Sequence, residues 1–66
     1  MEKTITITDD METPLVVALR MGKNATEELR KFATDRGEED EALRYKKDIQ
    51  AIDQILELIR RAKWKY

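Results

Sequence analysis

Hydrophobic and polar residues alternate with a period of two at the start of the chain and with a helical period after it. Residues 3–8 place isoleucine at every second position, between threonines, which is typical of a half-buried β-strand. From Leu15 onward the apolar residues recur in alternating steps of three and four, which is typical of an amphipathic helix. The chain is therefore predicted to be mainly α, with a short N-terminal β-strand followed by two helices.

The first helix is predicted over residues 14–35. Thr13 can cap its N-terminus, and Pro14 suits its first position because the missing N–H would be unpaired there. The apolar stripe expected to face the second helix consists of Leu15, Ala18, Gly22, Ala25, Leu29 and Phe32, and Leu19 and Ala33 widen it. Gly22 leaves open an alternative in which one helix ends there and another begins at Asn24, although the unshifted phase of the stripe favours one continuous helix.

The second helix is predicted over residues 38–63, after Gly37, which can take the left-handed conformation that ends a helix. Its apolar stripe consists of Ala42, Tyr45, Ile49, Ile52, Leu56 and Ile59. Two helices joined by so short a turn are expected to fold back as an antiparallel hairpin, with Leu15 level with Leu58. The whole chain, residues 1–66, is expected to form a single domain.

Apolar residues outside these stripes predict self-association. A chain of 66 residues buries too small a share of its unfolded surface to be more than marginally stable alone. This one has no cysteine or histidine for a disulfide or a zinc site. We expect a homodimer or a higher even-numbered oligomer in which the strands of two chains pair and the surplus apolar side chains meet. The expected interface residues are Ile5, Ile7, Val16, Val17, Leu43 and Leu58. The alternative is a monomer whose strand folds over its own hairpin.

Charge and chemistry exclude several classes of function. With 13 basic and 14 acidic residues the net charge is −1, so nothing draws the whole chain to nucleic acid or to an anionic membrane. No apolar run approaches the length of a membrane span. The sequence holds no catalytic, phosphate-binding or metal-binding motif, so neither enzymatic activity nor a cofactor is expected. The lack of cysteine fits a cytoplasmic protein.

Two clusters are candidate contacts with a protein partner. The first is the acidic segment after Gly37, which contains Glu38, Glu39 and Asp40. The second is the C-terminal cluster of cations and aromatic rings, which contains Arg60, Arg61, Lys63, Trp64, Lys65 and Tyr66. Cations beside aromatic rings bind phosphates and bases and anchor protein interfaces. Both clusters also suit the ends of helices, where their charges oppose the helix dipole.

Residues 3–36, with "TITIT" followed by "MGKNATEEL", resemble the ribbon-helix-helix family of DNA-binding repressors and antitoxins. That resemblance implies a two-chain ribbon whose Thr4, Thr6 and Thr8 read bases, and a phosphate contact at Asn24. Nearly the whole chain, with "TITITDD", "LVVALRMGKNATEELRKFATDRG" and "ALRYKKDIQAIDQILELI", also resembles small strand-plus-helical-hairpin proteins of phages and prophages. The second resemblance implies an accessory factor in the cytoplasm of a bacterial host.

The favoured function is therefore non-enzymatic binding of a protein by a homo-oligomer, as in an anti-defence-like inhibitor. One alternative is a DNA-binding repressor or antitoxin, although nucleic acid is not the favoured partner. Another is a sponge for a nucleotide signal, in which Arg61 and Trp64 contact the nucleotide.

Overall fold

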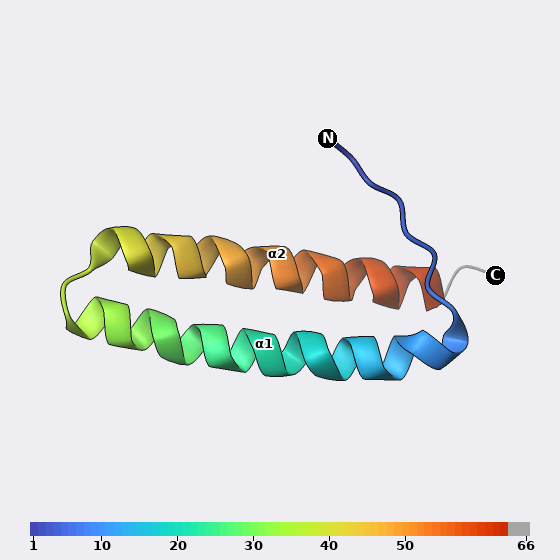
Figure 1. Ribbon diagram of the computed structural model, residues 1–66, viewed down its shortest axis with the longest axis horizontal. Helices are drawn as coiled ribbons and strands as arrows, with labels where there is room; N and C mark the ends of the chain where they lie inside the picture. Colours follow the sequence, from blue (N-terminus) through green and yellow to red (C-terminus); the bar gives the residue numbers. More distant parts are fainter. Residues whose placement is uncertain (64–66) are drawn as a thin grey trace.

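The chain folds into two long helices that lie side by side and run in opposite directions (Figure 1). The computed structural model describes residues 1–63. Helix α1 is Asp9–Asp35 and helix α2 is Glu39–Lys63. The mainly α class and the helical hairpin are thus confirmed.

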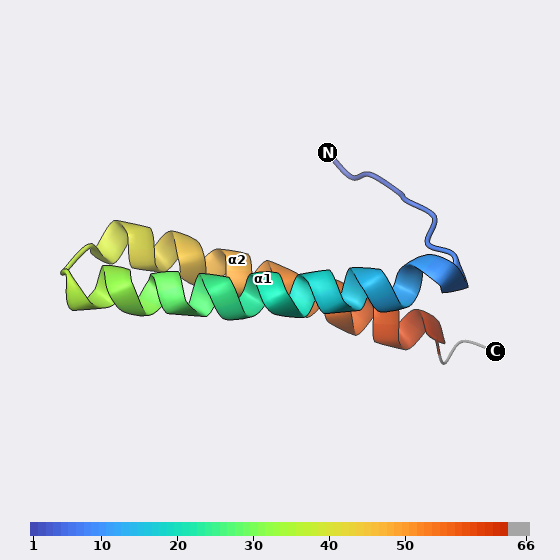
Figure 2. The same ribbon diagram turned by 60° about the horizontal axis from the view of Figure 1, so that its bottom comes forward.

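The predicted N-terminal strand is wrong. Residues 1–8 have no regular structure and lead away from the hairpin in both views (Figures 1 and 2), and residues 1–63 contain no strand at all. The alternation of isoleucine and threonine favours a strand locally, but a strand forms only beside another strand, and two helices offer none. Ile5 is accordingly 76% exposed.

Helix α1 begins earlier than the sequence predicts, at Asp9. The backbone of Thr8 is extended, and its carbonyl accepts a hydrogen bond from the N–H of Met11 at 3.0 Å. Three acidic residues in the first turn stabilise this end, because negative charge there opposes the helix dipole. Thr13 and Pro14 lie inside α1. The first turn bends away from the axis of the rest of the helix (Figure 2), as a proline within a helix commonly causes.

The turn between the helices is closed by Gly37, which has the predicted left-handed conformation with φ of 76°. The N–H of Arg36 donates to the carbonyl of Phe32 at 3.1 Å, and the N–H of Glu38 donates to the carbonyl of Ala33 at 2.9 Å. These bonds satisfy carbonyls that the end of a helix leaves unpaired. They also hold Ala33 under the start of α2, where it is 4% exposed and the most buried of the core residues.

The two helices meet along a seam that differs from the prediction on α1 only. On α2 the predicted stripe is the buried one, with Ile49 and Ile59 at its centre. On α1 the buried residue is Ala33, and the half-buried residues are Glu12, Leu15, Val16, Leu19, Lys23 and Thr26. All of these except Glu12 and Leu15 follow a residue of the predicted stripe by one position. Helix α1 is therefore turned by about 100°, the step of one residue, toward the side on which Leu19 and Ala33 widen that stripe.

Two features explain why a less apolar stripe faces α2. The turn holds the end of α1 close to α2 through the bond from the N–H of Glu38 to the carbonyl of Ala33, and the small side chain of Ala33 fits between the helices there. The polar members of the seam are then satisfied: Lys23 forms an ion pair with Asp53 on α2 at 2.7 Å, and the hydroxyl of Thr26 donates to the carbonyl of Gly22 at 2.7 Å.

Candidate protein-interaction surface

The stripe predicted to lie between the helices lies instead on the outside of the hairpin. In an antiparallel pair, the positions that precede the seam by one residue point to the same side on both helices. On α1 these positions are Met11, Leu15, Ala18, Gly22, Ala25, Leu29 and Phe32. On the second half of α2 they are Ala51, Ile55, Leu58 and Ala62. We call these residues together the apolar face.

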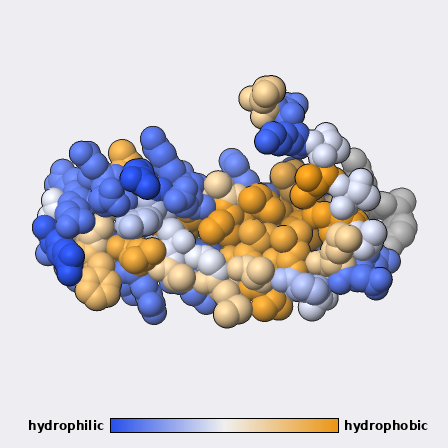
Figure 3. Space-filling view, viewed as in Figure 1, coloured by the Kyte–Doolittle hydropathy of each residue, from blue (hydrophilic) through white to orange (hydrophobic). Residues whose placement is uncertain are grey.

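The apolar face is largely uncovered. Phe32 is 62% exposed and Leu58 is 64% exposed, and Met11, Leu29 and Ile55 are also classed among the exposed large hydrophobic residues. Figure 3 shows apolar atoms gathered where the N-terminal half of α1 lies beside the C-terminal half of α2. Exposed apolar patches that extend over several neighbouring side chains mark contact sites for other molecules.

Gly22 lies at the middle of the apolar face with open space in front of it. A Cβ atom built at this position meets nothing within 4 Å. The predicted stripe places Gly22 against the second helix, and that placement is wrong, because α2 packs on the neighbouring stripe. The α1 helix nevertheless continues through Gly22 without a break.

The opposite side of the hairpin is polar, and we call it the charged face. It includes Arg20, Lys31, Lys46, Asp53, Glu57 and Arg60. The ion pair between Lys23 and Asp53 links the two helices along its edge, and the hydrogen bond to Asp53 raises the pKa of Lys23, with desolvation opposing that shift. Val16, a predicted interface residue, lies instead within the seam, half-buried beside Leu56.

The basic cluster near the end of α2 is bound to a carboxylate. The guanidinium of Arg60 donates two hydrogen bonds to the carboxylate of Glu57, from Nη2 to Oε1 at 3.0 Å and from Nε to Oε2 at 3.2 Å. Arg61 donates a third bond to the same carboxylate at 3.4 Å. These bonds, led by the one from Arg60, lower the pKa of Glu57. Lys63 ends α2, and the rest of the predicted cluster, Trp64, Lys65 and Tyr66, lies outside the described residues.

The acidic segment lies at the other end of the molecule from that basic cluster (Figure 1). Glu38, Glu39 and Asp40 are all exposed, and their charges favour the start of α2 through its dipole. Within residues 1–63 no three acidic side chains are grouped closely enough to hold a metal ion. The two clusters proposed from the sequence are therefore separate surfaces and not one site.

The predicted interface residues are also dispersed. Leu58 belongs to the apolar face, whereas Val17 and Leu43 follow the seam by one position, at distant points of the charged face. Ile5 and Ile7 belong to the segment before α1. The sequence carries no signal that the α1 stripe is a surface, because the most regular apolar stripe of a helix ordinarily faces the core.

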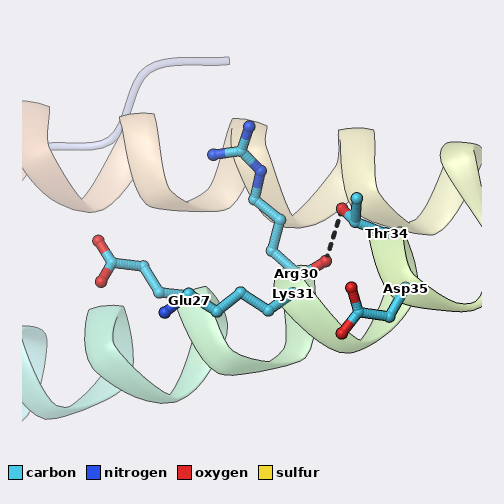
Figure 4. Close-up of a pocket in the computed structure, with 5 residues that line it drawn as sticks. All are labelled: Glu27, Arg30, Lys31, Thr34 and Asp35. Carbon is cyan, nitrogen blue, oxygen red and sulfur yellow. Dashed lines mark hydrogen bonds between the residues drawn. The ribbon is translucent and has the colours of Figure 1, made fainter.

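A depression near the turn is lined by side chains of both charges (Figure 4). It has a volume of about 450 Å³ and is formed by Glu27, Arg30, Lys31, Thr34 and Asp35. Arg30 extends toward α2, and the hydroxyl of Thr34 donates to the carbonyl of Arg30 at 2.9 Å. Two cations beside two carboxylates give this hollow no net attraction for an anion.

Comparison with known proteins found no matching family, no similar curated protein and no similar solved structure. Neither α1 nor the described part of α2 has a stretch long and apolar enough to cross a membrane. The surface of the hairpin is therefore the basis for assigning a function.

Proposed function

We propose that the protein is a non-enzymatic binding module that docks a protein partner on its apolar face. The observation that carries this proposal is the uncovered stripe along α1, which continues onto the second half of α2. Apolar residues spaced by three and four along an exposed helix are the anchors by which helices pack into partner proteins. The charged face then keeps the other side of the hairpin in contact with water.

An accessory or inhibitory role in a bacterial cytoplasm is part of this proposal, on the strength of the resemblance to small phage and prophage proteins. DNA binding is less favoured, because a ribbon-helix-helix arrangement needs a strand and a helix break near Gly22, and α1 is continuous there. Nucleotide binding is less favoured because Arg61, one of its expected contacts, is bonded to Glu57.

The apolar face can be tested with two matched leucines on α2. Leu58 lies on the apolar face and is 64% exposed, whereas Leu43 lies on the charged face and is 52% exposed. Leu58→Gln should abolish capture of the partner by the tagged chain, and Leu43→Gln should leave it intact, because only the first change places a polar group in the contact. Bound proteins, including a second copy with another tag, are identified by mass spectrometry.

Circular dichroism establishes that both variants keep the helicity of the hairpin. Capture that survives Leu58→Gln but is lost when Arg60 or the acidic segment Glu38–Asp40 is neutralised would place the contact elsewhere and refute the proposed face.

A further inference from the structure

The exposed stripe of α1 has the same order of side-chain sizes from either end. From N- to C-terminus its members are Met11, Leu15, Ala18, Gly22, Ala25, Leu29 and Phe32. Two large residues, a small one and the glycine are thus followed by a small residue and two large ones. Leu15 and Leu29 stand two helical turns on either side of Gly22, and no member of the stripe carries a charge.

We infer that the occupant of the apolar face is a second copy of this chain, with the two α1 helices crossing antiparallel at Gly22. This inference rests on the proposed function, because it names the partner for the same face. In a two-fold dimer, if one residue of the first chain contacts a given residue of the second chain, the same pair of residues also meets with the chains exchanged. With the axis at Gly22, Ala18 lies beside the partner's Ala25, and Leu15 lies beside the partner's Leu29.

The sizes of the side chains suit a crossing at this point. Two helices that cross are closest at the crossing point and diverge toward their ends, at axial separations of about 8–10 Å. The open space in front of Gly22 admits the backbone of a second helix. Farther out, the gap widens and needs large side chains, which Met11 and Phe32 provide at the two ends of the stripe.

The pattern of charge favours α1 over α2 as the helix that contacts its own copy across the two-fold axis. On the half of α2 nearest the turn, the same side of the hairpin carries Glu41, Arg44 and Asp48. An antiparallel copy of α2 would place these charges over Ile55 and Leu58. Of the two helices in the described chain, only α1 has a stripe outside the seam that is uncharged along its whole length, so α1 is the element that fits its own copy.

The amount of exposed surface is sufficient for such a dimer. The chain exposes 6216 Å², whereas a compact monomer of its mass, 7.8 kDa, exposes about 4,400 Å². Residues 1–8, all of them exposed, and the exposed apolar side chains of the helices both contribute to this difference of about 1,800 Å². A standard interface buries about 800 Å² on each partner.

Cysteine cross-linking tests the crossing point, because the native chain has no cysteine. Gly22→Cys should form a disulfide-linked dimer on oxidation, since the two copies meet at the axis. Ala18→Cys and Ala25→Cys should each form no disulfide alone, although the dimer remains, but should cross-link to each other when the two variants are mixed. Alone, the two copies of Cys at position 25 would lie about 9 Å apart along the helices, beyond the reach of a disulfide.

A second measurement uses two exposed apolar residues of α1. Leu29, on the apolar face, is 48% exposed, and Val17, on the charged face, is 50% exposed. Leu29→Glu should weaken dimerisation by at least about 100-fold in analytical ultracentrifugation, because it buries an unpaired charge on each copy. Val17→Glu should leave the dimer unchanged, and circular dichroism should show equal helicity for both.

Two outcomes would overturn the inference. Cross-linking of Leu15→Cys to Leu58→Cys, without a link at position 22, would show a dimer in which α1 packs on α2 of its partner. A wild-type chain that sediments as a monomer at about 100 µM, a concentration at which typical homodimers form, would exclude self-association. If the chain is a monomer but captures another protein, and Leu58→Gln abolishes that capture, the proposed function stands and only the second-copy inference fails. If Leu58→Gln does not affect the capture, the proposed function and the second-copy inference are both refuted.

Discussion

Replacing Gly22 by alanine should stabilise the hairpin. Gly22 is helical, and among the described residues only Gly37 has a positive φ. A Cβ at position 22 meets nothing within 4 Å, so the added methyl causes no clash. The bond from the hydroxyl of Thr26 uses the backbone carbonyl of Gly22 and survives the change. What remains is the difference in helix propensity, which favours alanine by about 1 kcal/mol.

For a chain of this size, about 1 kcal/mol corresponds to a rise in Tm of roughly 4–8 °C. Thermal and urea unfolding followed by circular dichroism at low micromolar concentration measures it. Gly37→Ala is the matched control, because the same methyl is added to a residue with φ of 76°. There it should lower the stability by about 1 kcal/mol or more, since left-handed backbone disfavours any side chain. The same chemical change should therefore have opposite signs at the two glycines.

An unchanged or lower Tm for Gly22→Ala, under conditions in which the chain is monomeric, would refute the open helical environment of this position. A gain that shrinks as the protein concentration rises has a different meaning. It would indicate that the methyl enters the crossing between two copies, since only that contact depends on concentration.

Three further changes test the hairpin. Ile49→Ala should cost about 2–3 kcal/mol in urea unfolding because Ile49 is a core residue, whereas Ile55→Ala on the apolar face should cost clearly less. The lowered pKa of Glu57 means that its bonds stabilise the fold at neutral pH and that this contribution is lost as the pH falls below about 4.3 and through the lowered pKa. The Tm of Glu57→Gln should accordingly fall less than that of the wild type on acidification, and equal falls would contradict the linkage. Lys23→Leu should raise the urea midpoint, because it places an apolar side chain in the seam and removes only one partly exposed ion pair. A lower midpoint would show that the ion pair stabilises the hairpin more than the apolar side chain does.

Periodicity predicts the hairpin but not the rotation of its first helix. The stripe of α2 around Ile49 and the left-handed Gly37 were both correct, because each depends on local spacing or on a single backbone requirement. On α1 two neighbouring stripes have the same spacing. The stripe that is buried contains Lys23, which finds its partner Asp53 only in the folded hairpin, and Thr26, whose hydroxyl is satisfied by the carbonyl of Gly22 within α1. The spacing of residues cannot reveal such partners.

The strand and the seam of α1 were mispredicted for related reasons. Ile5 and Ile7 have the propensity and alternation of a strand, but pairing is a property of the neighbours, and the hairpin supplies none. Leu58 was correctly singled out as surplus to the seam. The larger part of the apolar face, centred on Gly22, was assigned to the interior because the most apolar stripe of a helix ordinarily lies there.

The two helices are connected at one end, by the turn at Gly37, and this makes the hairpin fold from that end and open from the other. Facing residues near Gly37 are separated by few positions in the chain, and the separation grows steadily toward Asp9 and Lys63. Contacts that are short in sequence form first and quickly, so folding should start at the turn and spread outward. Amide hydrogen exchange should consequently be slowest near Ala33 and progressively faster toward the open end, where the helices fray.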